Sequence, residues 1–237
     1  MSVLFIADLH LHDKQPEIYR RFANFLKTKA RNARALYILG DLFEYYLGDD
    51  VKQGVIAQVA QDIDDLVKKY NTRCYFMPGN RDFLLAENFS NQLTLIPDAT
   101  VIKLDDKRLI LSHADNLCTD DKTYQKIRKQ LRDPQWQKWF LSQTIEERMT
   151  FAENARKQSQ EHTKSSNSEI MDVNQQTVNL LFKQYKATYL LHGHTHRPAF
   201  HQFEYGDSSY LRMVLGDWHY QSSYIEYINN SFKQVLC

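Results

Sequence analysis

Five short polar motifs, each directly after an apolar run, constrain the fold of this chain more than any other feature. In sequence order they are Asp8-Leu9-His10, Gly40-Asp41-Leu42-Phe43-Glu44, Gly79-Asn80-Arg81-Asp82, Ser112-His113 and His192-Gly193-His194-Thr195-His196. Short apolar runs favour β-strands, and ligands of open α/β folds bind beyond the carboxyl ends of strands. The motifs therefore predict a layered α/β fold whose strand ends share one site.

The motifs carry seven side chains of types that bind metal ions: Asp8, His10, Asp41, Asn80, His113, His194 and His196. Imidazole and carboxylate ligands suit Mn²⁺, Fe²⁺ or Zn²⁺. Seven ligands exceed the four that close a structural zinc site, and they suit two metal ions sharing a bridging carboxylate, an arrangement that hydrolyses phosphate esters. Singly the motifs are weaker: His113 alone also suits a satisfied strand-end histidine, and the last motif alone suits a solvated loop.

Strand and helix patterns alternate along the chain. The predicted strands are Val3–Ala7, Ala35–Leu39, Arg73–Met77, Arg108–Ser112, Thr188–Leu191, Leu211–Leu215 and Tyr224–Ile228. Apolar residues at helical spacing predict a helix that begins at Pro16, a second over Val55–Val67 and a third over Val178–Tyr185. Such alternation is typical of a parallel or mixed sheet covered by helices.

The composition is that of a globular protein with a substantial core. Of 237 residues 43% are hydrophobic, and a net charge of +1 offers no general attraction for nucleic acid. No apolar run approaches the roughly 20 residues that span a bilayer, and the first residues do not resemble a signal peptide. Cys74, Cys118 and Cys237 lack paired spacing and are expected to be reduced thiols. We expect a location on the cytoplasmic side, soluble or peripheral to the membrane.

Residues 121–170 interrupt the alternation, because they contain neither glycine nor a strand pattern. Among many charges, ten basic and seven acidic, they concentrate the large apolar side chains Trp136, Trp139, Phe140, Met149 and Phe151. We expect helices here, the second beginning at Pro134, and a loop over 164–168. The predicted division is a core of residues 1–120 and 171–237 and an inserted cap of residues 121–170.

Two interpretations of this inserted segment remain open. One is an ordinary pair of helices packed on the sheet. The other is a lid whose apolar side faces a ligand and whose basic flank faces an anionic membrane surface.

The order of the motifs resembles that of the calcineurin-like metallophosphoesterases, whose pattern is Asp-x-His, Gly-Asp, Gly-Asn-His, a lone His and Gly-His-x-His. The resemblance implies a layered β-sandwich flanked by helices. It places Asp8, His10 and His196 on one metal ion, Asn80, His113 and His194 on the other, and Asp41 between them as the bridge. His192 falls outside that ligand pattern.

Position 81 departs from the general family, which carries a histidine there as proton donor to the leaving group. Arg81 cannot be a general acid near neutral pH, because its pKa is far too high. Its guanidinium can instead clamp a phosphate through two parallel hydrogen bonds. The resemblance together with this chemistry assigns catalytic roles to Asp41, Asn80 and Arg81.

One branch of the family carries four further matches, and the chain resembles that branch, the UDP-2,3-diacylglucosamine diphosphatases, over nearly its whole length. The matching stretches are 8–11, 40–44, 79–83 and 169–174. The branch implies cleavage of the pyrophosphate of UDP-2,3-diacylglucosamine in lipid A biosynthesis, giving UMP and 2,3-diacylglucosamine 1-phosphate. It also implies two divalent metal ions, with Mn²⁺ expected, and peripheral contact with the cytoplasmic face of the inner membrane. No nucleic acid and no protein partner are implied.

Substrate contacts are also implied by the resemblance: Asn80, Arg81, Asp121, Ser159, Thr163, Ser166 and His194. The cap contacts depart in part, because the branch often has Asn and Lys where Thr163 and Ser166 stand, and Lys164 offers a neighbouring charge. A second departure is Ala114, where the family usually has glycine; alanine keeps the turn feasible.

The expected mechanism is in-line attack of metal-activated water on the α-phosphorus, with Arg81 stabilising charge on the phosphoryl oxygens. A phosphate leaving group has low basicity, which fits the missing histidine. Two other functions remain open: a soluble nucleotide pyrophosphatase or phosphodiesterase, and a metal-binding scaffold that binds a partner without turnover. Acyl-free UDP-sugars would discriminate the first, and a metal-dependent hydrolysis assay the second.

Overall fold

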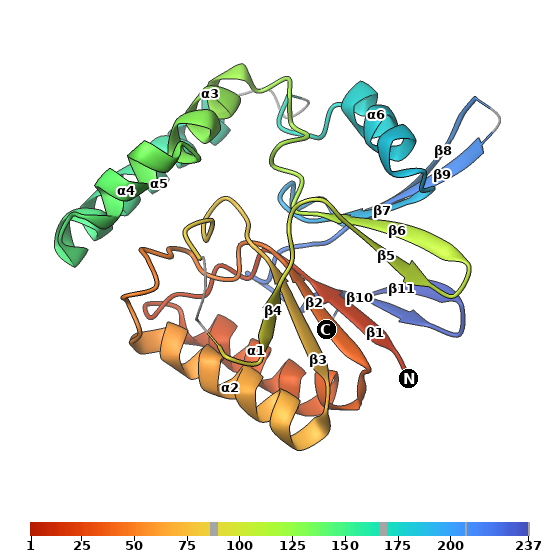
Figure 1. Ribbon diagram of the computed structural model, residues 1–237, viewed down its shortest axis with the longest axis horizontal. Helices are drawn as coiled ribbons and strands as arrows, with labels where there is room; N and C mark the ends of the chain where they lie inside the picture. The colour runs from red at the N-terminus through yellow and green to blue at the C-terminus, as the bar shows by residue number, and fades with distance from the viewer. Residues whose placement is uncertain (86–89, 166–169, 207, 237) are drawn as a thin grey trace.

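Two mixed β-sheets pack face to face in the computed structural model, and helices cover their outer faces (Figure 1). The structure describes residues 1–85, 90–165, 170–206 and 208–236. In spatial order, the first sheet contains β11 (Ser231–Leu236), β10 (Ser223–Ile228), β1 (Val3–Ile6), β2 (Ala35–Leu39), β3 (Arg73–Met77) and β4 (Leu93–Leu95). The second contains β5 (Thr100–Leu104), β6 (Lys107–Ser112), β7 (Tyr189–His192), β9 (Ser208–Val214) and β8 (Ala199–Tyr205). The predicted layered α/β fold is confirmed.

Strand β1 shows how the sequence fills both sides of the first sheet. Successive strand side chains point to opposite faces. Val3 and Phe5 join the apolar cluster between the two sheets, while Leu4 and Ile6 join the cluster beneath the helices on the outer face. A strand buried on both faces needs an uninterrupted apolar run, and the sequence supplies one.

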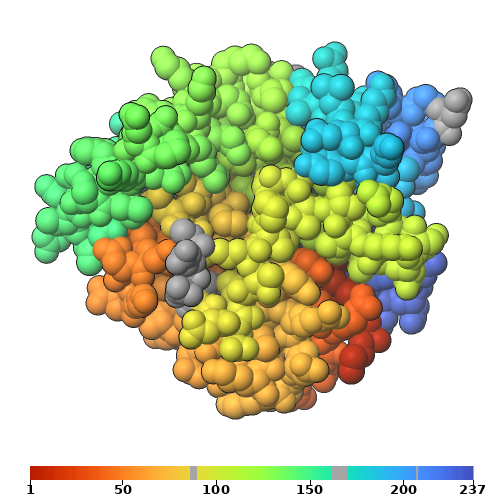
Figure 2. Space-filling view, viewed as in Figure 1, coloured from red at the N-terminus to blue at the C-terminus, as the bar shows by residue number. Residues whose placement is uncertain are grey.

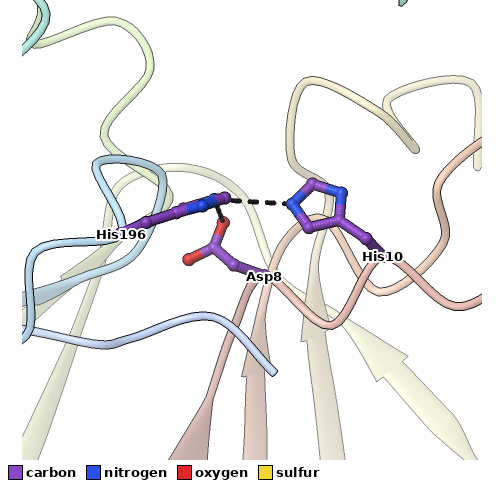
Figure 3. A group of neighbouring side chains, drawn as sticks. All are labelled: Asp8, His10 and His196. Carbon is purple, nitrogen blue, oxygen red and sulfur yellow. Dashed lines mark hydrogen bonds and ion pairs between the residues drawn. The ribbon is translucent and has the colours of Figure 1, made fainter. Parts of the chain in front are cut away.

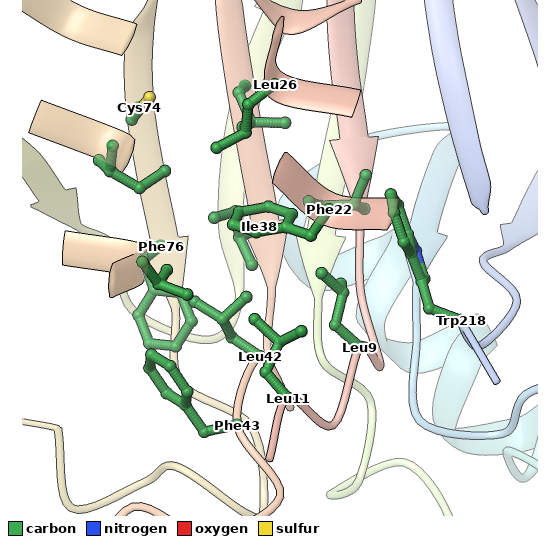
Figure 4. Packing of buried hydrophobic residues seen from close by; sticks show 14 of the residues in the cluster. Leu9, Leu11, Phe22, Leu26, Ile38, Leu42, Phe43, Cys74, Phe76 and Trp218 are labelled. Atoms are coloured by element: carbon green, nitrogen blue, oxygen red, sulfur yellow. The ribbon is translucent and has the colours of Figure 1, made fainter. Parts of the chain in front are cut away.

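Three helices cover the outer faces of the sheets. Helix α1 (Pro16–Thr28) and helix α2 (Gly54–Tyr70) lie on the first sheet, and α6 (Gln175–Tyr185) lies on the second. Figure 4 shows Phe22 of α1 beside Ile38 of β2 and on the side of Trp218. A short 3-10 helix, η1 (Ala30–Asn32), follows α1. The three helices predicted from apolar spacing are therefore confirmed.

The directions of the strands bring the five motifs to one edge. Strands β1, β2, β3 and β4 are mutually parallel, as are β6, β7 and β9. The motifs follow β1, β2, β3, β6 and β7, so they all leave carboxyl ends of central strands. This edge is where open α/β sheets place their ligands.

The sequence did not predict four of the strands, and all four lie at sheet edges. They are β4 and β11 in the first sheet and β5 and β8 in the second. An edge strand has one unpaired side and is commonly short or polar, so it lacks the apolar run that identified the central strands. In β8, for example, exposed and half-buried residues alternate without a fully buried one.

The inserted segment is helical, as expected, and consists of α3 (Lys122–Leu131), α4 (Pro134–Leu141) and α5 (Ile145–Ser165). Pro134 begins the second of them, as predicted. The loop expected over 164–168 is wrong at its start, because residues 164 and 165 still belong to α5. Polar composition alone does not end a helix. Residues 166–168 lie outside the described residues. Figure 2 shows the three helices (green) as a ridge along one side of the molecule.

An aromatic cluster and a buried arginine attach this ridge to the core. Trp136 stacks on Phe140 with ring centroids 5.0 Å apart, and Phe83 from the loop after β3 packs against Trp136. Arg148, only 3% exposed, donates to the carbonyl of Leu47 at 2.6 Å and pairs with the carboxylate of Asp50. Both contacts reach loops that follow strands of the first sheet.

Candidate metal centre

The backbone at the predicted ligands is unusual. Among the described residues, eleven that are not glycine have φ in the left-handed region, and five of these are predicted ligands. They are Asp8 (φ 57°), His10 (52°), Asp41 (52°), His194 (67°) and His196 (54°). Residues other than glycine adopt this region at a cost of about 1–2 kcal/mol each. Strain concentrated in this way is typical of functional sites, where the surrounding structure enforces it.

Backbone pairing between two loops enforces part of this geometry. The N–H of Asp8 donates to the carbonyl of Gly40 at 3.1 Å, and that of His10 donates to the carbonyl of Asp41 at 2.9 Å. Leu11 continues the ladder by donating to Leu42 at 2.8 Å. The loops after β1 and β2 therefore run side by side, which aligns their ligands.

One group of ligands joins the first and last motifs (Figure 3). Nε2 of His196 lies 3.4 Å from Oδ1 of Asp8 and 3.4 Å from Nε2 of His10. The three ligand atoms lie within 4.8 Å of one another, close enough to share a cation. Residues nearly two hundred positions apart in the sequence thus meet as predicted.

Asp41 stands between this group and a second one. Its Oδ2 lies 3.9 Å from Nε2 of His10, and its Oδ1 lies 3.5 Å from Nε2 of His113. Ligand atoms of Asp8, Asp41 and His113 likewise lie within 4.8 Å of one another. Because the two oxygens of Asp41 face different histidines, the carboxylate has the placement that a bridging ligand requires.

Asn80 contacts His194, the remaining histidine of the predicted ligands. Its Oδ1 lies 2.9 Å from Nε2 of His113 and 2.8 Å from Nδ1 of His194. The backbone N–H of His194 also donates to Oδ2 of Asp8 at 2.9 Å. The structure therefore gathers all seven predicted ligands into one cluster.

Three histidines have an oxygen atom near their second nitrogen. Nδ1 of His113 lies 2.9 Å from the carbonyl of Leu39, and Nδ1 of His10 lies 3.1 Å from Oε2 of Glu44. Nδ1 of His196 lies 3.6 Å from Oδ2 of Asp217. Metal-binding histidines commonly hold an oxygen acceptor in this way, which directs the other nitrogen to the ion. Here the other nitrogen in each case points into the cluster.

The electrostatics of the cluster suit cations. Burial raises the pKa of Asp8, but the charges of His196 and His113 outweigh it and lower the pKa to about 2. Burial lowers the pKa of His113, yet the carboxylates of Asp41 and Asp8 raise it to about 9. Burial and the charge of His113 lower the pKa of His194 to about 4. The carboxylates that favour a proton on His113 favour any cation at this place, and a bound metal ion would displace that proton, so the donor set fits divalent ions.

Gly79 is required by close approach rather than by its φ. A Cβ at this position would lie 2.3 Å from Oδ1 of Asp41 and 2.5 Å from its backbone nitrogen. Gly40 has the same difficulty with His113, at 2.4 Å, and its φ of +88° also favours glycine. The two glycines let the loops after β2 and β3 close on the cluster.

Two buried carboxylates beyond the predicted set hold the cluster together. Asp82 accepts hydrogen bonds from the backbone N–H groups of Gly79 and Leu42, both at 2.7 Å. Asp115 accepts a hydrogen bond from the hydroxyl of Tyr124 at 2.9 Å and pairs with the guanidinium of Arg128 at 2.7 Å. These contacts attach α3 to the end of β6. The signal available for both was an acidic residue two positions after a predicted ligand.

The structure places the predicted substrate contacts unevenly. The backbone N–H of Arg81 donates to Oδ1 of Asp41 at 2.8 Å, and its guanidinium lies 3.5 Å from Oγ of Ser159 on α5. Nε of Arg81 is buried and, within the described part of the chain, has no hydrogen-bond partner. Such a donor suits an anion. The carboxylate of Asp121 caps α3 by accepting a hydrogen bond from the backbone N–H of Tyr124 at 2.8 Å.

Two of the predicted substrate contacts, Thr163 and Ser166, fall near the end of α5 in the sequence. Thr163 lies in α5, but its side chain, like Ser166 as a whole, lies outside the described residues. His192 is buried, with Nε2 3.3 Å from Arg212, and stands outside the ligand group as expected. Cys74 and Cys118 are buried free thiols. Among the described residues, none of the helices has the length and apolar character to cross a membrane.

Comparison with known proteins agrees with this geometry. The family described as calcineurin-like phosphoesterase matches residues 1–198. A UDP-2,3-diacylglucosamine hydrolase of Aromatoleum aromaticum is 44% identical over 96% of this chain and 93% of its own length. Proteins of the same name from Photorhabdus laumondii and Pectobacterium carotovorum are 41% and 42% identical, over 99% and 95% of this chain and 98% and 95% of their own lengths.

Proposed function

Because the chain belongs to the calcineurin-like phosphoesterases and is related over nearly its full length to proteins named UDP-2,3-diacylglucosamine hydrolase, we propose that it hydrolyses UDP-2,3-diacylglucosamine. The products are UMP and 2,3-diacylglucosamine 1-phosphate, an intermediate of lipid A biosynthesis. The observation that carries this proposal is the cluster of seven ligands with Asp41 between the histidines His10 and His113.

The cluster is proposed to hold two divalent cations, Mn²⁺ being the expected one. Asp8, His10 and His196 would bind one ion, Asn80, His113 and His194 the other, and Asp41 both. Such ions activate water near neutral pH and neutralise charge on phosphoryl oxygens. The buried carboxylates and neutral imidazole support this assignment, and Glu44, Leu39 and Asp217 orient the histidines toward it.

Arg81 is proposed to clamp the diphosphate. Its backbone is fixed by Asp41 and its guanidinium reaches toward Ser159, so the side chain spans the gap between the cluster and α5. A guanidinium offers two parallel hydrogen bonds to phosphate oxygens, and it stays charged throughout. The departing lipid phosphate is a weak base, so no general acid is needed at position 81.

The inserted segment is proposed to supply the wall for the acyl chains. It exposes Trp139, Leu141, Ile145 and Phe151 in part, alongside the buried Phe140. Each buried methylene of a lipid contributes roughly 0.8 kcal/mol. The same exposed side chains, next to basic residues, support peripheral contact with the cytoplasmic face of the inner membrane.

The decisive experiment is UMP release from UDP-2,3-diacylglucosamine after chelation and stepwise return of Mn²⁺, Mg²⁺ or Zn²⁺. We expect activity to vanish on chelation and to return with metal. Run in ¹⁸O-labelled water, the reaction should place the label in UMP, because water attacks the α-phosphorus. Label in the lipid phosphate would disprove that direction of attack. Equal turnover of acyl-free UDP-sugars would instead favour a soluble nucleotide pyrophosphatase.

A further inference from the structure

A cavity of about 380 Å³, lined by polar and charged residues, lies beside the ligand cluster, between the core and α5. We call it the lateral cavity. Its lining comes from the loop after β1 (His12, Lys14 and Gln15), the loop after β2 (Glu44 and Tyr45), α5 (Glu153, Arg156, Lys157 and Gln160) and His219. None of these residues belongs to the predicted metal ligands or to the predicted substrate contacts.

The lateral cavity adjoins the metal centre through two of its walls. Glu44 lines the cavity and lies 3.1 Å from Nδ1 of His10. The ring of His219, also in the wall, lies parallel to the His10 ring with centroids 6.3 Å apart. If one phosphate of a ligand lay at the cluster, the group next to that phosphate could therefore enter this cavity.

The charged side chains of the walls argue against a lipid chain. Three cationic side chains, Lys14, Arg156 and Lys157, face two carboxylates. The carboxylates are neutralised in place: Glu44 pairs with Arg156 at 2.6 Å, and Glu153 lies 3.6 Å from Lys14. An apolar chain would strip these ion pairs of water, and that desolvation costs more than the burial of the chain returns.

The walls instead offer rings and amides. His12 and Tyr45 meet edge to face with centroids 5.5 Å apart, and His219 adds a third ring. Gln15 and Gln160 each bring an NH₂ donor group and a carbonyl acceptor on a single amide. A planar base with alternating carbonyl and N–H groups matches both features, by stacking on rings and by paired hydrogen bonds to an amide.

We propose that the lateral cavity binds the uridine of the substrate, holding the nucleoside while the α-phosphate lies at the metal centre. The inference rests on the proposed function. A volume of 380 Å³ lies near the lower end of the roughly 300–1,000 Å³ found for small-molecule sites. It accommodates one polar half of the substrate, so the diacyl half leaves the cluster on another side.

The test uses the full-length, metal-loaded protein with Tyr45→Ala and Gln160→Ala, and Tyr70→Ala as the matched control. Tyr70 ends α2, is 48% exposed and lies outside the cavity. Three quantities are measured: kcat/KM for UDP-2,3-diacylglucosamine, kcat/KM for bis(4-nitrophenyl) phosphate, which has no nucleoside, and the inhibition constant of UMP. Melting temperatures establish that each variant is folded.

Stacking on an aromatic side chain is worth about 1–3 kcal/mol per base, and 1.4 kcal/mol is tenfold. Tyr45→Ala should therefore lower the ratio of the two kcat/KM values about tenfold and raise the UMP inhibition constant by a similar factor. Gln160→Ala should act in the same direction, and Tyr70→Ala should change neither quantity. In the unmodified protein, UMP should inhibit more strongly than ribose 5-phosphate.

Three results would overturn the inference while leaving the proposed function standing. One is an unchanged ratio and an unchanged UMP constant in both cavity variants. Another is a loss confined to the lipid substrate with UMP binding intact, which would give the cavity to the sugar and acyl half. The third is equal inhibition by UMP and ribose 5-phosphate. Absence of metal-dependent hydrolysis of UDP-2,3-diacylglucosamine in the unmodified protein would instead defeat the proposed function itself.

Discussion

The loops at the strand ends and the inserted segment hold their side chains in different ways. In the loops, Asp8, Asp41 and His113 are buried, and each is fixed by backbone or side-chain contacts on several sides. In the segment, α3 has no buried residue at all, and α4 has only Phe140. A few ion pairs and one aromatic cluster attach the segment to the core. The candidate metal ligands are thus built on the sheet, whereas the proposed substrate contacts of the segment are built on an addition held by fewer buried side chains.

The largest effect is expected when the negative charge of Asp41, at the centre of the ligand cluster, is removed. Asp41→Asn takes one charged ligand from both proposed ions and should lower kcat/KM on the order of a thousandfold or more, since losing only an outer partner of a metal ligand costs about 10–100-fold. The checks are UMP release and metal content per chain. Asp106→Asn, on an exposed hairpin, serves as control. A variant that kept two ions and full turnover would refute the bridge.

Arg81 stands where the two regions meet, and its geometry rather than its charge should matter. Arg81→Lys keeps the positive charge but loses the two-pronged donor, so kcat/KM for UDP-2,3-diacylglucosamine should fall about 10–100-fold. Steady-state kinetics of Arg81→Lys and Arg81→Ala provide the measurement, with the exposed Arg31→Lys as control. If Arg81→Ala kept normal rates at limiting and saturating substrate, the clamp would be wrong.

Detaching the inserted segment should separate binding from chemistry. Arg148→Ala removes the hydrogen bond to Leu47 and the pair with Asp50, whose carboxylate is half exposed and can be rehydrated. Hydrogen bonds to charged groups contribute about 1.5–3 kcal/mol, so the free energy of unfolding should fall by about that amount. The variant should also lose more activity on the diacyl substrate than on an acyl-free UDP-sugar.

Denaturant titration and paired kinetics would check this, with Lys138→Ala on the exposed face of α4 as the control. Equal losses on the two substrates would mean that the segment does not discriminate between them. Unchanged stability would mean that Arg148 does not attach it.

The smallest expected effect comes from an alanine-to-glycine substitution, made once in a loop at a strand end and once in the inserted segment. Ala114 has φ +83° and is fully buried. Ala114→Gly relieves about 1–2 kcal/mol of strain but loses a buried methyl and adds freedom to the unfolded chain, so the net change should be near zero. Ala155→Gly in α5 relieves nothing and should destabilise by about 1 kcal/mol. Thermal denaturation of both variants gives the comparison, and equal destabilisation would contradict it.

The sequence predicted the central strands and the gathering of the ligands because one property served both. An uninterrupted apolar run marks a strand buried on two faces, and a polar residue directly after it marks the strand end. Edge strands such as β8 carry neither signal, which is why they were missed. The roles of Asp82 and Asp115 depend on contacts with backbone N–H groups and with α3, and no local pattern specifies such partners.

The position of the ligands within those motifs was predictable, but their orientation was not. Which nitrogen of His113 faces the cluster is decided by the carbonyl of Leu39, and for His10 it is decided by Glu44. The lateral cavity was also beyond prediction, because its walls come from four separate segments. Its residue types, such as His12 and Gln15, are ordinary for exposed loops.

The place of β1 in the first sheet has a consequence for how the protein is made. This strand, residues 3–6, pairs with β2 on one side and with β10, near the other end of the chain, on the second side. His10 and His196 are likewise 186 positions apart. Closing so long a loop costs chain entropy before any contact repays it, and such topologies fold slowly. On the ribosome, β1 emerges long before β10 exists, so this sheet and the ligand cluster are completed only after the residues that follow His196 have been synthesised.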